Sequence, residues 1–508
     1  MTRDKKLRTV IMHDPELDDI NTMIRYLLYS NQFDTEGLIY TSSRFHWKGD
    51  GKGTLFHGVS EHSTTFNKGP ITHWRWDENS YFLHAVVDIY AKVYPNLSIH
   101  AKEYPHPDEL RSKIYDGNVE FPGDISKDSP GSNLIKKLIL DEKPGRLYLL
   151  TGAGQSTIGR ALKSIEEKYK NHRQWGNIYK NICEKVIIQS FGDQDDIYEY
   201  YIGPNWPNIE FREMATNIWG YPARRVVLPE DRHYLSAAWM RENVSNVGPF
   251  GEFYVVWGDG KQLHKNDITD FFGFSGLTVE QLEELGFFIW CDGIEEPGSW
   301  ISEGDTSMFL NLVDNGLDGH VDASYGGWGG RNGKDIDPNG IASKDYSSTR
   351  WFGAAQRDFA ARMQWTVQST YEEANHQPII ELVDTENKTV SPGQTVELKA
   401  IVKDPDGDHL TGSWWQYVEA GTYPSEVELT SPGKERETGS SVTIPMTVPS
   451  PNSLNMAEIT EDEIEVISKF TAPTDATDGQ TLHFILEATD NGSISLTSYK
   501  RVVLTVSR

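Results

Sequence analysis

The segment Val10–Ile20, VIMHDPELDDI, places four carboxylates within six residues. It begins with an apolar run typical of a short buried strand and leads into residues 21–28, whose apolar side chains recur at helical spacing. The acids therefore lie on a turn at the carboxyl end of a strand. Asp18 and Asp19 suit the first turn of the helix, where the helix dipole favours negative charge. Asp14 adds repulsion that such a cap does not need, and carboxylate clusters suit Ca²⁺ or Mg²⁺, so a metal site and a plain cap both stay open.

Two segments give the chain a resemblance to known families. Residues 14–19, DPELDD, resemble the Asp-Pro-Gly-x-Asp-Asp signature of nucleoside hydrolases, which hold a Ca²⁺ at the strand ends of an α/β sheet. Residues 33–43, FDTEGLIYTSS, resemble the second strand of the same family. The continuation 44–49, RFHWKG, resembles instead the narrower nucleoside-hydrolase-like, cellulose-binding family of polysaccharide-degrading bacteria, and this resemblance extends over nearly the whole chain.

The resemblance implies a set of ligands for Ca²⁺. Asp14 and Asp19 would bind the ion together with Asp305, which lies in a loop before a helical apolar run in 300–310, WISEGDTSMFL. A backbone carbonyl would come from the Gly-rich turn in 148–158, YLLTGAGQSTI, from Gln155 or Ser156, and we place Ser156 in the ligand set. From the residues alone, Asp305 and this turn are equally compatible with ordinary helix caps.

The resemblance also implies catalytic roles. Asp14 would take the proton of an attacking water, and Asp18 would bind a sugar hydroxyl. The chain departs from the nucleoside hydrolase pattern at Met12, where that family carries an Asp, and at Glu16, where it carries a Gly. Ser42 and Ser43 stand where an Asn is expected. These departures weaken nucleoside hydrolysis more than they weaken the metal site.

Three further loops carry candidate substrate contacts. Ser43 and Trp47 lie just before a long insert, residues 48–79, which Lys48 opens. The insert is rich in Gly, His and aromatic residues and is typical of a binding loop. The segment 188–196, IQSFGDQDD, resembles a block of the narrower family and suggests contacts through Asp193 and Gln194, although a solvated acidic turn fits nearly as well. The segment 325–331, YGGWGGR, offers Trp328 for stacking on a sugar and Arg331 for binding oxygen or carboxylate.

Three functions remain open on these residues. The first is hydrolysis of a glycosidic bond at a carboxylate-bound Ca²⁺. The second is β-elimination from a uronate, in which His46 or Tyr325 is the base and Lys48 or Arg331 neutralises the carboxylate. The third is glycan binding without catalysis, in a pocket inherited from an enzyme.

The pattern predicts two domains. Up to residue 375, apolar runs alternate with helical stretches, which favours an α/β domain with a mostly parallel sheet and helices on both faces. From 376 to 508, β-type runs separated by Pro, Gly and Asp turns favour an immunoglobulin- or cadherin-like β-sandwich. Within it, the acidic turn 404–408, DPDGD, is compatible with Ca²⁺, but we expect a solvent-facing hairpin.

Composition limits the partners. The net charge of −27 argues against nucleic acid, which needs a basic footprint, and no apolar run is long enough to cross a membrane. We expect a polysaccharide or oligosaccharide as partner. The segment 1–6, MTRDKK, is not typical of a signal peptide. The family resemblance nevertheless leads us to expect a secreted or periplasmic protein.

Overall fold

The computed structural model describes residues 5–261, 263–264, 284, 296–383, 388–431 and 463–507. It divides into two compact units. The α/β unit comprises Lys5–Leu310 with Arg362–Ser369, and the sandwich unit comprises Asn311–Ala361 with Thr370–Arg508. Our domain boundary between residues 375 and 376 stays a prediction. No helix in the described part of the chain has the length and apolar character needed to cross a membrane.

Six parallel strands form the sheet of the α/β unit, in the order β3-β2-β1-β4-β5-β6. Their bounds are β1 Leu7–His13, β2 Phe33–Tyr40, β3 Ile114–Asp116, β4 Leu147–Thr151, β5 Val186–Ser190 and β6 Glu210–Glu213. The central strands are buried on both faces, as expected for apolar runs in a parallel sheet.

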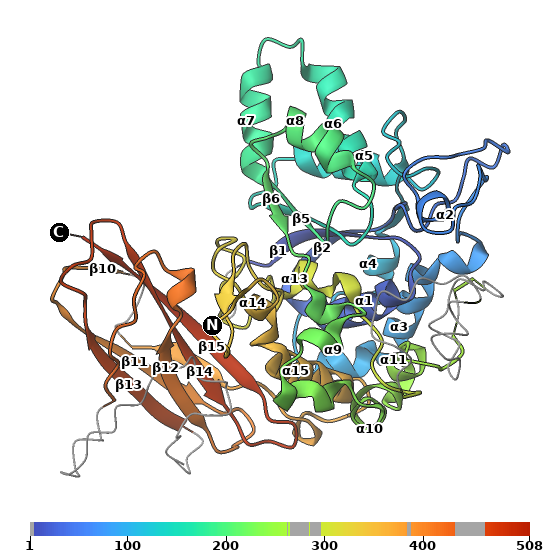
Figure 1. Ribbon diagram of the computed structural model, residues 1–508. Coiled ribbons are helices and arrows are strands. Elements are labelled where there is room, and N and C mark those ends of the chain that lie inside the picture. Colours follow the sequence, from blue (N-terminus) through green and yellow to red (C-terminus); the bar gives the residue numbers. More distant parts are fainter. Residues whose placement is uncertain are drawn as a thin grey trace, which may run out of the picture. The chain divides into compact units, whose positions relative to one another are not determined.

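Helices cover both faces of this sheet, with α5, α6 and α7 on one side and α1 and α3 on the other (Figure 1). The helices up to β6 are α1 Leu17–Leu28, α2 Glu61–Thr64, α3 Phe82–His100, α4 Pro107–Arg111, α5 Pro130–Leu140, α6 Ser156–Tyr169, α7 Trp175–Lys185 and α8 Gly203–Asn205. The later ones are α9 Ala223–Val226, α10 Ala237–Met240, α11 Gly248–Phe253, α13 Ser307–Leu310, α14 Tyr346–Thr349 and α15 Phe352–Trp365.

A continuous apolar core joins the sheet to the helices on one of its faces. Val10 and Met12 of β1 and Leu149 of β4 pack with Ile158 and Leu162 of α6, and all five are fully buried. Burying a side chain of this size contributes about 1.5–3 kcal/mol, so this layer stabilises the packing of β1 and β4 on α6. The loops that follow those strands are thereby held on a rigid edge.

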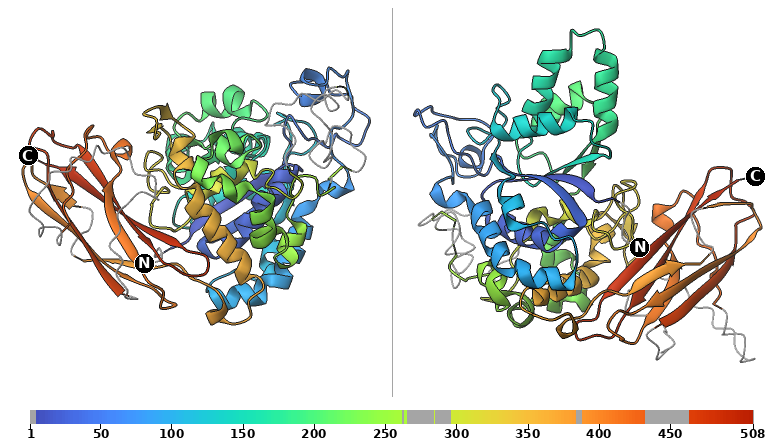
Figure 2. Two further views of the ribbon diagram at one scale, coloured as in Figure 1. Left: turned by 60° about the horizontal axis from the view of Figure 1, so that its bottom comes forward. Right: turned by 180° about the vertical axis from the view of Figure 1, so that it is seen from behind.

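The sandwich unit contains two antiparallel layers and a small two-stranded sheet. One layer has the order β10-β15-β14-β12, in which β10 pairs with β15 in parallel, and the other has the order β13-β11-β9. Figure 2 shows the two layers in side view. The bounds are β9 Ile379–Leu382, β10 Lys388–Val390, β11 Thr395–Lys403, β12 Thr411–Gln416, β13 Glu463–Thr471, β14 Thr481–Thr489 and β15 Thr497–Val506, with β7 Asp335–Ile336 and β8 Ala342–Ser343 forming the small sheet.

The predicted fold class is confirmed in both parts: a parallel α/β sheet with helices, and a β-sandwich. The sequence pattern also predicts strands over 287–290 and 441–448 and a helix over 280–285, and these lie wholly or almost wholly outside the described residues. Several elements were not predicted, among them the three-residue strands β3 and β10 and the nine-residue strand β13. The predicted helix 81–94 extends as α3 to His100, whose ring stacks on Trp365 with centroids 5.8 Å apart.

Candidate functional site

The acidic stretch lies at the carboxyl edge of the sheet, where the ends of three neighbouring strands meet. β1 ends at His13, and its carbonyl accepts a hydrogen bond from Thr41 N, just after β2, at 2.8 Å. Gly152 N, just after β4, donates to the carbonyl of Met12 at 3.1 Å. The turn after β1 closes with Glu16 N donating to the carbonyl of Asp14 at 3.0 Å. Loops that are distant in sequence therefore converge on Asp14.

Seven ionisable side chains gather there in overlapping groups whose ligand atoms lie within 4.8 Å of one another. The groups are His13, Asp19 and Asp305; Asp14, Glu16 and His46; and Glu16, Asp18 and Asp19. Asp305 comes from the short 3₁₀ helix η8, Gly304–Thr306, nearly 290 residues further along the chain than Asp19. The structure thus places the three predicted metal-binding aspartates, Asp14, Asp19 and Asp305, in one cluster.

Two glycines make this close approach possible. A Cβ at Gly152 would lie 2.4 Å from the carboxylate carbon of Asp305. A Cβ at Gly304 would lie 2.4 Å from Oδ2 of Asp18. Neither distance is compatible with any side chain, so the absence of a Cβ at both positions allows the carboxylates to reach the cluster.

Each of three aspartates has one oxygen engaged and one without a partner. Oδ2 of Asp14 accepts a hydrogen bond from Ser43 Oγ and lies 3.1 Å from His46 Nδ1. Oδ2 of Asp18 accepts from Ser302 Oγ at 3.0 Å, and Oδ1 of Asp19 lies 2.5 Å from His13 Nδ1.

The other oxygens, Asp14 Oδ1, Asp18 Oδ1 and Asp19 Oδ2, are buried and have no hydrogen-bond partner among the described residues. A buried carboxylate oxygen without a partner costs free energy unless something compensates its charge. Carboxylate oxygens are the preferred ligands of a hard divalent cation and also accept hydrogen bonds from hydroxyl groups, so these three oxygens fit a cation with a hydroxyl-bearing ligand beside it.

Burial and mutual repulsion shift the pKa values of these acids upward. Burial raises the pKa of Asp18 to about 6. Burial, followed by the nearby charge of Asp305, holds the pKa of Asp19 well above its usual range. The pKa of Asp305 is raised well above its usual range by burial and by the charge of Asp18. Burial lowers the pKa of His13 to about 3, so this ring is neutral. The cluster is therefore short of positive charge.

A buried network that the sequence did not reveal holds Asp305 in place. Arg25, on α1, lies with Nε 2.5 Å from Oε2 of Glu303, and Nη2 donates to Oε1 at 2.9 Å. Both side chains are fully buried. Asn21, one turn earlier on α1, donates to the carbonyl of Ser302 at 2.9 Å. The helix that follows the acidic turn thus also anchors the segment that carries Asp305.

The Gly-rich turn predicted to supply a carbonyl ligand is held by another acid. Asp195 accepts hydrogen bonds from Gln155 N at 2.8 Å and from Ser156 N at 2.9 Å, so it caps α6. Gln194 Nε2 lies 2.5 Å from the carbonyl of Gly152 and thereby fixes the loop against which Asp305 packs. Asp193 Oδ2 accepts from Glu199 N at 3.0 Å. A ligand role for Ser156 and substrate contacts through Asp193 and Gln194 stay predictions.

Trp47, expected to contact substrate, is fully buried instead. Its ring packs against Phe56 and Phe121, with centroids 5.1 and 5.7 Å away, and therefore presents no open face to a sugar. The alternation of aromatic and polar residues in this loop gave no sign of which ring faces inward. Lys48, the next residue, does reach the surface, and its Nζ donates to the Tyr81 hydroxyl at 2.6 Å.

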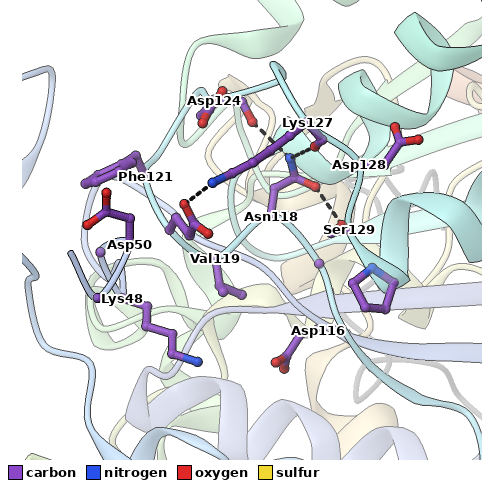
Figure 3. A pocket seen from close by; sticks show the side chains of 15 residues that line it. Lys48, Asp50, Asp116, Asn118, Val119, Phe121, Asp124, Lys127, Asp128 and Ser129 are labelled. Carbon is purple, nitrogen blue, oxygen red and sulfur yellow. Dashed lines mark hydrogen bonds and ion pairs between the residues drawn. The ribbon is translucent and has the colours of Figure 1, made fainter. Parts of the chain in front are cut away.

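A pocket of about 400 Å³ lies in the same unit as the acidic cluster but is lined by other residues. The segment 41–49 joins the two, since Ser43 binds Asp14 while Lys48 N and Gly49 N donate to the carbonyls of Val119 and Glu120 at 2.8 Å. Figure 3 shows the polar side chains around it, with Asn118 bonded to Ser129. The lining comprises Lys48, Gly49, Asp50, Gly51, Asp116, Gly117, Asn118, Val119, Glu120, Phe121, Asp124, Lys127, Asp128, Ser129 and Pro130.

The charge of the pocket lining is negative. It contains the five acids Asp50, Asp116, Glu120, Asp124 and Asp128 and the two lysines Lys48 and Lys127. Lys127 is ion-paired with Glu120, which leaves little positive charge for an anionic ligand. Phe121 and Val119 add apolar surface. The lining suits a neutral, hydroxyl-rich ligand better than an acidic one.

The remaining three predicted residues, Tyr325, Trp328 and Arg331, belong to the sandwich unit and are engaged there. Trp328 is 1% exposed, so it offers no ring face for stacking, contrary to expectation. Arg331 Nε donates to Asp335 Oδ1 at 2.6 Å and is likewise buried. The ring of Tyr325 stands edge-on to His483, with centroids 4.8 Å apart. The glycine-rich stretch 325–331 therefore packs as a structural turn. The sequence alone was compatible both with such a turn and with a sugar-binding site.

Two family models match the chain. Residues 8–332 match the model described as "Cellulose-binding Sde182, nucleoside hydrolase-like domain". Residues 395–506 match "Cellulose-binding protein Sde0182, C-terminal domain". Among curated proteins, none matches.

One solved structure is similar over the whole chain. It is described as a nucleoside hydrolase-related hypothetical protein from Saccharophagus degradans that is associated with carbohydrate metabolism. It is 24% identical and covers 99% of this chain and 100% of its own, with a TM-score of 0.68, which supports the fold. A conjugative transposon lipoprotein from Bacteroides eggerthii is 22% identical over 25% of this chain and 95% of its own, at a TM-score of 0.16.

Proposed function

Because the chain belongs to the family of cellulose-binding Sde182 proteins with a nucleoside hydrolase-like domain, we propose that it is a carbohydrate-active enzyme that hydrolyses glycosidic bonds at the acidic cluster. The observation that carries the proposal is the set of three buried aspartate oxygens without partners, on Asp14, Asp18 and Asp19. A merely structural cluster would satisfy these oxygens with hydrogen bonds from its own chain.

Asp19 and Asp305, which offer ligand atoms within 4.8 Å of each other, would hold a Ca²⁺ together with Asp14 from the adjoining group, with Ser156 supplying a further oxygen ligand in the family pattern. When bound there, the ion would act as a Lewis acid, lowering the pKa of a water molecule and orienting sugar hydroxyls. His13 holds Asp19 through its Nδ1 and, being neutral, adds no positive charge that would repel the ion.

Asp14 is the general base of this proposal. Its Oδ2 is fixed by Ser43 Oγ and faces His46 Nδ1, which leaves Oδ1 to accept a proton from the attacking water. Ser43 and His46 are positioning residues in this scheme. Asp18 uses its free Oδ1 to accept a hydrogen bond from a sugar hydroxyl.

The pocket in the α/β unit would bind a further part of the glycan. Its five carboxylates against two lysines would repel a uronate and tolerate a neutral sugar, whose hydroxyls can bond to acids such as Asp116. This charge balance places a neutral glycan ahead of the uronate required for β-elimination. β-Elimination would need one site shared by His46, Lys48, Tyr325 and Arg331. The contacts of Tyr325 with His483 and of Arg331 with Asp335, both within the sandwich unit, give no support to such a site.

Glycan binding without catalysis is the second candidate function, and the family's description as cellulose-binding favours it. The two candidates predict different products from the same assay. The test is a screen of plant and algal polysaccharides, followed by reducing ends and by near-ultraviolet absorbance. New reducing ends without absorbance support hydrolysis, an absorbing unsaturated product indicates elimination, and retention of the protein on a glycan with neither product indicates a binder.

A further inference from the structure

A second cluster of carboxylates lies at one end of the sandwich unit, in the turn between β11 and β12. The turn 404–408, DPDGD, directly follows β11, and the ligand oxygens of Asp404, Asp406 and Asp408 lie within 4.8 Å of one another. Three acids on an exposed turn would need no explanation. Pro405, Asp406 and Gly407 are exposed, so the turn faces solvent as its sequence predicts, although β11 and β12 pair in different sheets and form no hairpin. Asp404, however, is only 8% exposed.

The two oxygens of Asp404 have different surroundings. Oδ1 accepts hydrogen bonds from Asp406 N and Asp408 N, both at 2.9 Å, and so shapes the turn. Oδ2 is buried and has no hydrogen-bond partner among the described residues. Burying this oxygen costs free energy, because it loses its hydrogen bonds to water and forms no hydrogen bond with the protein.

A second buried aspartate approaches from the neighbouring loop. Thr489, the last residue of β14, pairs with Thr411, the first residue of β12, so the loop after β14 lies beside the acidic turn. His409 N donates to Asn491 Oδ1 at 2.9 Å and ties the two loops together. Asp490, the residue between Thr489 and Asn491, is 4% exposed, and its Oδ2 also lacks a partner among the described residues.

These charges act on one another, since the charge of Asp404 is among the causes that raise the pKa of Asp490, after burial itself. The residues that lead into β9 complete the surroundings. His376 N donates to Asp406 Oδ2 at 2.7 Å, and Asn375 Nδ2 donates to Asp490 Oδ1 at 2.9 Å. Two loops and the chain entering the sandwich therefore meet around four aspartates. The described surroundings include no Lys or Arg bonded to them.

We propose that the aspartates of the β11–β12 turn, with Asp490 beside them, form a Ca²⁺ site that joins the two loops and the entry to β9. Carboxylates on a turn, with glycine at Gly407 in the left-handed region (φ 84°), suit the flexible all-oxygen coordination of Ca²⁺. The role that follows is structural: the ion fixes one end of the sandwich. The site is separate from the acidic cluster of the α/β unit and does not depend on the proposed function.

The test is calorimetric titration of the metal-stripped full-length protein with Ca²⁺, in wild type and three variants. Asp404→Asn keeps an Oδ1 for the two backbone hydrogen bonds of the turn while removing the charge. Asp408→Asn removes a charge without touching those bonds. Glu428→Gln, at an exposed position of the same unit, removes one charge elsewhere and serves as the control.

We expect Asp404→Asn to remove one Ca²⁺ equivalent per chain or to weaken its binding at least tenfold, and Asp408→Asn to weaken it in the same direction. Glu428→Gln should bind as wild type does. A protein carrying Asp14→Asn and Asp19→Asn should keep this equivalent, which separates it from the α/β unit. Unchanged stoichiometry and affinity in Asp404→Asn, or no Ca²⁺ binding by the Asp14→Asn, Asp19→Asn protein, would overturn the proposal.

Hydrogen exchange gives a second readout that does not depend on heat signals. Ca²⁺ should slow amide exchange in residues 404–412 and 489–496 of wild type, and it should not do so in Asp404→Asn. Equal protection in both proteins would contradict a site on this turn.

Discussion

At the level of single residues, the carboxylates of the acidic cluster come closer together than their charges favour. The backbone permits this only because Gly152 and Gly304 lack a Cβ against Asp305 and Asp18. The sequence signalled the acids but not these contacts, since a Gly in a turn is ordinary and only the fold shows what lies opposite it.

Gly152→Ala tests this packing. The added Cβ would lie 2.4 Å from the carboxylate carbon of Asp305, so the side chain must move away from the cluster. We expect a loss of about 1–3 kcal/mol in unfolding free energy from overpacking and at least tenfold weaker Ca²⁺ binding, measured by urea unfolding and calorimetry. Gly176→Ala, in helix α7, meets nothing within 4 Å and is the matched control, with a stability equal to or above that of wild type. Wild-type Ca²⁺ binding by Gly152→Ala would show that Asp305 is not a ligand.

Protonation of the cluster gives a second prediction at this scale. Ca²⁺ needs ionised carboxylates, whereas burial raises the pKa of Asp18 to about 6 and holds the pKa values of Asp19 and Asp305 well above their usual range. Because the folded pKa values are raised, protons are held at low pH and must leave when the ion binds. The affinity of this site should therefore fall by at least about tenfold from pH 7.5 to pH 5.5. Calorimetry in two buffers of different ionisation enthalpy measures the released protons, and binding that is equal at both pH values, without proton release, would refute the prediction.

At the scale of elements, α1 does more than follow the acidic turn. Its Arg25 and Asn21 hold the 302–306 segment, so one helix fixes both halves of the cluster. The helical pattern of residues 20–30 predicted α1 but not this function, because an Arg on a helix is normally a surface residue and its partner, Glu303, is 278 residues away. The strands and helices that the sequence predicted are those with long apolar runs. β3, with three residues, carries too little pattern to be recognised.

Arg25→Met tests the anchoring role. It leaves Glu303 charged and fully buried, so we expect a loss of about 3–5 kcal/mol in unfolding free energy together with weaker Ca²⁺ binding at the cluster. Arg111→Met breaks the ion pair of Arg111 with Asp88 on the surface and should cost less than about 1 kcal/mol. Urea unfolding of both variants decides the matter, and equal, small losses would mean that the Arg25–Glu303 pair does not hold the segment.

At the scale of the whole molecule, composition and family resemblance predicted the α/β fold, the sandwich and the carbohydrate association, and the family models agree. The site was predicted only in part. The family resemblance pointed to Asp14, Asp19 and Asp305, which lie in one acidic cluster, whereas the sequence could not tell that Trp47 and Trp328 are buried or that the acids of residues 116–128 line a pocket. Such features depend on packing between distant segments, which a local pattern does not encode.

The net charge of −27 and the acidic pocket together predict the class of glycan. Neutral cello-oligosaccharides should bind with little dependence on salt, while oligogalacturonides should bind at least tenfold more weakly at low ionic strength. Asp116→Asn should weaken binding of the neutral sugar, and Glu142→Gln, an exposed acid of the same unit, should not. Tighter binding of the uronate in a calorimetric titration would reverse the assignment and favour elimination.

The most direct test of the central claim is release of reducing ends from the glycan that gives the strongest signal in the screen. Wild-type protein with Ca²⁺ should release them steadily, and Asp14→Ala should fall to background while still folding cooperatively. Release by Asp14→Ala at the wild-type rate would contradict the account.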